Sequence, residues 1–207
     1  MTPPPTEGTT LPTPPLPPAD RHAAALQGLA TFLVQSEMIL ASWDAYSEKH
    51  TDVDGYPYDE ESYGWRKVQR DVQTWRAFEP VRRSARDLLA TARFQLRHMA
   101  AGDFDDRWPW QLSELTKALD RLEALRDEWT KAREAGRTSR PTHEQFIDAL
   151  AERNAEAWSE LDTWATQGRA LLDVHFAAFK TPAPVPTKVP DPTLMATAAA
   201  GRPAVRR

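Results

Sequence analysis

The chain has 207 residues, a formal net charge of −4 and no cysteine. The lack of cysteine excludes disulfide bonds, thiolate metal sites and cysteine nucleophiles, and the acidic balance argues against a protein that mainly neutralises nucleic-acid phosphates. No unbroken apolar run approaches the ~20 residues that span a bilayer. The N-terminus has neither the basic nor the apolar region of a signal peptide, so we expect a cytoplasmic protein.

Proline divides the chain into three parts. Of the 18 prolines, eight lie in residues 1–18 and six in residues 181–207. These two segments are rich in Pro, Thr and Ala and hold few large apolar side chains, so we expect disordered tails. Residues 19–180 are long enough to form one domain with its own apolar core.

The first half of this domain predicts two long helices. The first spans Asp20–Glu48, with Asp20 as the N-cap and leucines at helical spacing. After an acidic loop, the second spans Asp59–Ala101 and is followed by Gly102, a good terminator. Because an interior proline removes a backbone hydrogen bond, Pro80 predicts a kink or a break near Glu79.

The second half predicts two more helices. One spans Pro109–Ala135, and the other begins at a capping box formed by Thr142 and Gln145 and ends before Pro182. Short connections favour antiparallel neighbours. We therefore expect an all-α antiparallel four-helix bundle with helix 2 kinked or broken near Pro80, and three helices plus a detached first helix as the alternative.

The loop after the first helix has a weak calcium-loop pattern. If Gly55 takes the sixth position of an EF-hand loop, Asp52, Asp54 and Glu61 take the third, fifth and twelfth. However, a histidine and a proline stand where a carboxylate and an aliphatic residue are expected. The simpler interpretation is an Asp-Gly turn followed by Asp59 as the cap of the second helix.

The same region forms an acidic and aromatic segment. Residues 44–61 hold seven acids and one lysine, with tyrosines and a tryptophan close by. Carboxylates beside aromatic faces attract a cation such as an arginine-rich peptide. Our predicted partner-binding residues here are Tyr56, Tyr58, Tyr63, Trp65, Asp59 and Glu60. The alternative is a solvated loop whose rings pack onto the domain.

Residues 66–97 are basic, with nine Lys or Arg against three acids. Arg82, Arg83 and Arg86 are the predicted contacts if this face binds an acidic partner or nucleic acid. The competing interpretation pairs these arginines with an acidic series on the last helix. That series is Glu144, Asp148, Glu152, Glu156 and Glu160.

Tryptophan is abundant, and Trp108 and Trp110, which flank Pro109, are further candidate interface anchors. No phosphate loop, nucleophile elbow or Glu-x-x-His di-metal signature occurs, and no cofactor is predicted. We therefore expect a non-enzymatic adaptor that binds a protein partner, and the wide apolar seams of the helices also favour self-association. The alternatives are a nucleic-acid-associated regulator and a small all-α metal protein or enzyme.

Overall fold

The structure, a computed structural model, describes residues 18–135 and 142–180. Their regular secondary structure is entirely helical, which confirms the all-α class. The predicted tails lie outside these residues, apart from Pro18. The elements are α1 (Pro18–His50), α2 (Glu60–Arg82), α3 (Ala85–His98), the 3₁₀ helix η1 (Ala101–Asp103), α4 (Trp108–Ala135), α5 (His143–Gln167) and α6 (Arg169–Lys180).

Several helix ends follow the local sequence. Asp59 caps α2 by accepting hydrogen bonds from two backbone N–H groups of the first turn, and the capping box of Thr142 and Gln145 is present at α5. The first helix differs from the prediction because Asp20 lies inside the first turn instead of at the N-cap. Proline suits the first helical position, where no N–H is needed, and α1 therefore starts at Pro18.

The predicted second helix is broken, but the break falls after Pro80. Pro80 lies inside α2, which runs on to Arg82 before α3 begins at Ala85. Between them Ser84 stays in the right-handed region, but its φ of −114° (ψ −1°) is far from the usual helical value near −63°. Its N–H and hydroxyl both donate to the Val81 carbonyl. The predicted end was also wrong, since α3 stops at His98 and Gly102 belongs to η1.

The predicted last helix is broken as well, at Gly168, which the sequence analysis did not anticipate. Gly168 donates its N–H to Trp164 at 3.0 Å, and its carbonyl accepts from Leu171 at 3.1 Å, closing a tighter i→i+3 turn. A Cβ at this position would meet the Trp164 carbonyl oxygen and lie 3.2 Å from Leu33 Cδ2. Glycine therefore lets the turn sit closely against α1.

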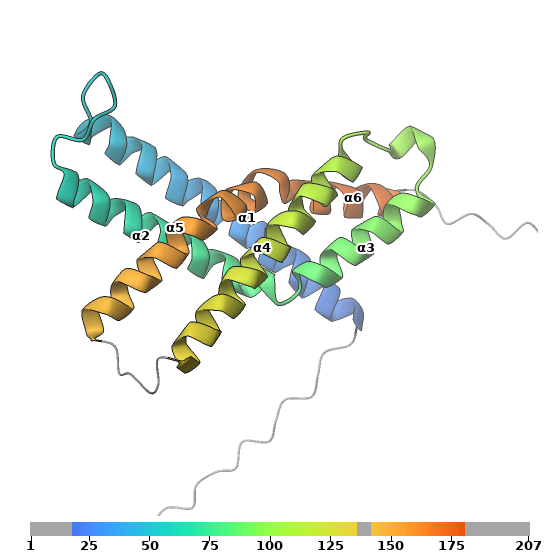
Figure 1. Ribbon diagram of the computed structural model, residues 1–207. Coiled ribbons are helices and arrows are strands. Elements are labelled where there is room, and N and C mark those ends of the chain that lie inside the picture. Colours follow the sequence, from blue (N-terminus) through green and yellow to red (C-terminus); the bar gives the residue numbers. More distant parts are fainter. Residues whose placement is uncertain (1–17, 136–141, 181–207) are drawn as a thin grey trace, which may run out of the picture.

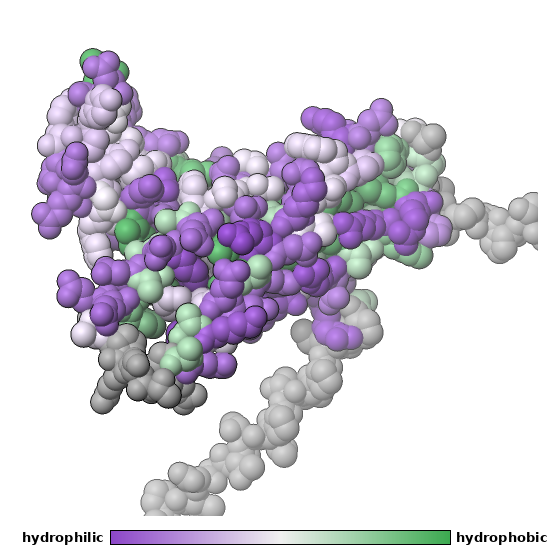
Figure 2. Space-filling model, viewed as in Figure 1, coloured by the Kyte–Doolittle hydropathy of each residue, from purple (hydrophilic) through white to green (hydrophobic). Residues whose placement is uncertain are grey.

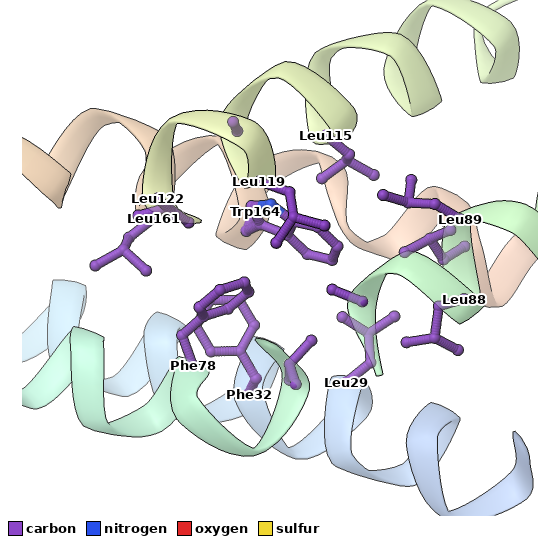
Figure 3. Packing of buried hydrophobic residues seen from close by; sticks show 14 of the residues in the cluster. Leu29, Phe32, Phe78, Leu88, Leu89, Leu115, Leu119, Leu122, Leu161 and Trp164 are labelled. Carbon is purple, nitrogen blue, oxygen red and sulfur yellow. The ribbon is translucent and has the colours of Figure 1, made fainter. Parts of the chain in front are cut away.

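The two breaks change how the helices pair. The α1–α2 and α4–α5 hairpins diverge, while α3 and α6 pack against each other and against α4 on the opposite side (Figure 1). The arrangement therefore differs from the predicted bundle of four antiparallel helices, because the two breaks produce the additional short helices α3 and α6. Its core lies where the hairpins meet, with Trp164 between Leu119 and Phe78, and Phe32 edge-on to Phe78 at 5.2 Å (Figure 3).

A buried arginine joins the two hairpins. Arg70 of α2 is 8% exposed and lies between two tryptophan rings, with its guanidinium carbon 4.5 Å from the centre of Trp43 and 3.6 Å from that of Trp158. Its Nε and one terminal nitrogen donate to Asp71 at 2.8 and 2.7 Å. Burial raises the pKa of Asp71, against the opposing hydrogen bonds from Arg70.

A second arginine repeats the pattern between α2, α4 and α5. Arg153 lies 4.5 Å from the ring centre of Trp75 and 5.2 Å from that of Trp129, and it donates to the buried side-chain oxygen of Asn154. Burial lowers the pKa of Arg153. Four of the eight tryptophans, Trp43, Trp75, Trp129 and Trp158, therefore pack against an arginine.

α1 has an unusually apolar composition for a helix at the surface. An 18-residue window within Ala19–His50 has a mean hydropathy of 1.3, and 17% of that window is buried. By length and composition α1 could cross a membrane, although Gln27 and Gln35 interrupt its apolar sequence. A core helix of a soluble protein or a signal sequence passes the same test.

Candidate functional site

The loop that joins α1 to α2, which we call the tip loop (residues 51–59), is ordered by its own hydrogen bonds. Thr51 and Pro57 form an isolated antiparallel bridge, and Gly55 has a φ of +85°, which suits glycine. The carboxylate of Asp52 accepts hydrogen bonds from the backbone N–H groups of Asp54 and Tyr56 at 3.0 and 2.8 Å. These bonds fix a compact turn at the free end of the hairpin (Figures 1 and 2).

An aromatic cluster beneath the tip loop holds the ends of α1 and α2 together. The ring of Tyr63 lies 5.0 Å from that of Trp43 and 6.0 Å from that of Tyr46, centre to centre. Its hydroxyl is 2.8 Å from the Ser47 hydroxyl, and Tyr46 stacks on His50 at 4.1 Å. Tyr63 is therefore half-buried and supports the loop from below.

Other aromatic and acidic residues at this end face solvent. Tyr56 and Tyr58 are each 71% exposed and Trp65 is 60% exposed, and most of the acids around them are exposed too. These side chains form what we call the tip surface: Asp54, Tyr56, Tyr58, Asp59, Glu60, Glu61 and Trp65. Of the residues predicted for this site, all but Tyr63 are therefore exposed, in the tip loop or in the first two turns of α2.

The tip surface keeps its negative charge uncompensated. Within residues 18–135 and 142–180, no ion pair involves any of the seven acids between Asp44 and Glu61. Hydrogen bonds from Ser62, and then from the backbone of the first turn of α2, lower the pKa of Asp59. This carboxylate therefore stays ionised at neutral pH, so the surface is suited to a positively charged ligand.

The calcium-loop residues are placed differently from a metal site. The carboxylate of Asp52 is occupied by backbone N–H groups, and among the described residues no group of three or more His, Cys, Asp or Glu gathers to hold a metal ion. The simpler interpretation, an Asp-Gly turn followed by a helix cap, matches the hydrogen bonds. Calcium binding by Asp52, Asp54 and Glu61 therefore stays a prediction, and the described structure does not bring these carboxylates together as ligands.

The three arginines predicted as a basic contact face are mostly engaged within the molecule. Arg82 binds Glu79 in α2, and Arg86 binds Asp120 and Glu123 in α4. The partners come from α2 and α4, and not from the acidic series of the last helix. Arg83 is exposed and has no ion pair with a described residue.

The two tryptophans near the start of α4 have different surroundings. Trp108 is 8% exposed and packs edge-on to Phe104 at 6.3 Å, so it belongs to the core. Trp110 is 58% exposed, and it stays a candidate anchor. Sequence spacing alone does not separate the two, because both flank the same proline.

A histidine pair at the far end of the molecule escaped the sequence analysis. Nε2 of His22 in α1 lies 3.4 Å from Nδ1 of His175 in α6, and the Gln95 side chain of α3 is equally close to that nitrogen. The rings of Phe176 and Phe179 also face His175. Burial, and then the charge of His22, lower the pKa of His175.

This pair predicts a loss of stability in mild acid. Because the pKa of His175 is lower in the folded than in the unfolded chain, its contribution is present above about pH 6.5 and is lost as the pH falls through the folded pKa. We expect the free energy of unfolding to fall more steeply below pH 6.5 in the wild type than in His175→Gln, as measured by urea unfolding. His98→Gln, at an exposed histidine, should behave like the wild type. Equal slopes for the wild type and His175→Gln would contradict this.

Comparisons of the chain with protein-family models, with curated proteins and with solved structures find no match.

Proposed function

We propose that the protein is a non-enzymatic interaction protein whose tip surface binds a positively charged segment of a partner protein. The observation that carries this is the occurrence of unpaired acids and exposed rings in the ordered tip loop and in the first two turns of α2. Tyr56, Tyr58 and Trp65 are each at least 60% exposed, and no ion pair among the described residues neutralises the carboxylates beside them.

The chemistry of the tip surface favours lysine and arginine. A guanidinium or ammonium group gains about 0.5–1 kcal/mol over an exposed aromatic ring, and nearby carboxylates add electrostatic steering and hydrogen-bond acceptors. The molecule already uses this chemistry internally, where Arg66 lies 5.7 Å from the ring centre of Tyr46. The hydrogen bonds of the tip loop also reduce the entropy lost on binding, because little is left to order.

The two rival functions have less support. A nucleic-acid function rests on Arg82, Arg83 and Arg86, of which two already bind acids of the same chain. A metal-dependent function has no gathered set of ligands among the described residues. We therefore rank both below partner binding through the tip surface.

The proposal predicts selective binding of basic peptides. A labelled Lys/Arg-rich peptide should bind the full chain, as measured by fluorescence anisotropy, with an affinity that falls as salt rises. The triple variant Tyr56→Ser, Tyr58→Ser, Trp65→Ser should bind at least about tenfold more weakly, since three rings at about 0.5–1 kcal/mol each contribute at least about 1.5 kcal/mol.

Two controls make this test specific. Phe94→Ser removes a comparably exposed ring (56%) from α3 and should leave binding unchanged. A Glu/Asp-rich peptide should not bind. If the triple variant bound the basic peptide as well as the wild type does, the tip surface would not be the site. Equal binding of the acidic peptide would contradict recognition by charge.

A further inference from the structure

The outer face of α1 is an uncharged surface that nothing in the described structure covers. Between Arg21 and Asp44 the only formally charged residue is Glu37, although 27% of the whole chain is charged. Val34 is 57% exposed and Met38 is 67% exposed on this face. Long apolar helix faces exposed to water are uncommon on monomeric soluble proteins and usually mark contact surfaces.

A groove runs beside this face, between α1 and the α5–α6 turn, with a volume of about 560 Å³. Its α1 wall is mainly apolar and includes Leu33, Val34 and Leu40, and the opposite wall includes Ala165 and Leu172. The tight turn at Gly168 brings the two walls together, because its backbone lies against side chains of α1. The packing of the α5–α6 turn against α1 therefore forms the groove.

The two walls of the groove carry opposite charges. Glu37 and Asp44 lie on the α1 wall, and neither has an ion pair with a described residue. Arg169 lies on the other wall and is largely exposed, and among the described residues its one ion pair is a 3.8 Å contact with Asp173. The groove thus has two acids on its α1 wall and one arginine on the opposite wall, and apolar residues lie beside both.

We propose that this groove is the interface of a symmetric dimer, and that its occupant is a second copy of the chain. A two-fold axis running along the groove exchanges its walls, so that α1 of one copy lies over the α5–α6 wall of the other. Glu37 and Asp44 of each copy then face Arg169 of the other copy, and the apolar residues of the two walls cover each other. Because of the two-fold symmetry, the ion pairs and the apolar contacts each form twice in the dimer.

The self-complementarity of the groove favours a second copy over an unrelated partner. A foreign helix would have to supply both an acidic and a basic edge in the right order, whereas this chain already carries both. α1 has 33 residues and is about 50 Å long, so it can extend the contact well beyond one groove. The inference does not depend on the tip surface, which lies at the end of the hairpin.

Analytical ultracentrifugation of the full chain tests the dimer. When its concentration is raised to about 0.1 mM, the wild type should sediment as a dimer. Val34→Glu should be monomeric, with the dissociation constant raised at least about 100-fold, because both copies then place a carboxylate among the apolar residues of the contact. Phe94→Glu, at an equally exposed ring on α3, should remain dimeric. A monomeric wild type, or a Val34→Glu protein that stays dimeric, would overturn the proposal.

A charge exchange tests the predicted pairing across the interface. Arg169→Glu should weaken the dimer at least about tenfold, and adding Glu37→Arg should recover part of this loss, because a base then replaces one of the two acids that face position 169. Arg121→Glu makes the same change in charge at an exposed position of α4 and should have no effect. Failure of the double variant to recover would exclude this arrangement. Binding of a monomeric wild type to phosphatidylcholine vesicles would identify a membrane as the occupant instead.

Discussion

Asp71→Ala should lower the free energy of unfolding by about 3–5 kcal/mol, the cost typical of leaving a buried charge without its partner. Asp71 is 2% exposed and accepts two hydrogen bonds from Arg70, which is itself held between Trp43 and Trp158. Without the carboxylate, the guanidinium stays buried and keeps only the two rings. Urea unfolding measured by far-UV circular dichroism gives the comparison.

A double variant separates the charge effect from the loss of packing. Arg70→Met together with Asp71→Leu removes both charges while filling similar space, so it should be much more stable than Asp71→Ala alone. Asp87→Ala, at an exposed acid of α3, should change stability by about 0.5 kcal/mol or less. If Asp71→Ala behaved like Asp87→Ala, the pair would contribute little to the fold.

The second large effect concerns the turn between α5 and α6. Gly168→Ala should destabilise the protein by about 1–3 kcal/mol, the usual cost of overpacking, because its Cβ would meet the Trp164 carbonyl and crowd Leu33. The backbone of Gly168 is right-handed (φ −60°, ψ −24°), so the effect is steric and does not arise from a forbidden conformation.

Gly64→Ala is the matched control for this turn. Gly64 lies inside α2, and a Cβ there would have no neighbour within 4 Å. Alanine should therefore stabilise the protein by about 0.5–1 kcal/mol through the lower entropy of the unfolded chain. Opposite signs in the two alanine variants are the expected result, and a shift in the same direction for both would contradict the steric explanation.

The sequence predicts the helices best where a local signal defines them. The Thr142 box and the Asp59 cap mark helix starts through contacts within one turn, and the leucines at 112, 115, 119 and 122 are buried as their spacing indicates. These features depend on neighbours in the sequence. They are visible without knowledge of the rest of the fold.

Other features could not be predicted because they depend on distant residues. In the sequence, Arg70 and Asp71 belong to a basic stretch that predicts a solvated face. Only the approach of α1 and α5 shows that both are buried, with Arg70 between Trp43 and Trp158. The break at Gly168 was equally hidden, since the apolar spacing continues unchanged through it. Glycine is tolerated inside helices and therefore gave no signal of a turn.

The sequence predicts which residue types occur at the candidate site, but it does not predict which rings are exposed and which are packed. Acids and aromatics do gather at the tip loop, yet Tyr63 packs beneath the loop while Tyr56 and Tyr58 face solvent. Likewise Trp108 is buried and Trp110 is exposed. Whether a ring is exposed depends on which neighbouring element packs against it, and the residue types alone do not reveal this.

The central claim is that the tip surface contacts a basic segment of a partner protein. Photo-crosslinking tests it most directly, with a photoreactive phenylalanine at Tyr58 and, as a control, at the exposed Arg121 of α4. In an extract of the source cells, position 58 should form an adduct whose linked peptide, identified by mass spectrometry, is rich in lysine and arginine. Position 121 should not form this adduct. The claim would be contradicted if position 58 gave no specific adduct, or one with a peptide lacking excess positive charge.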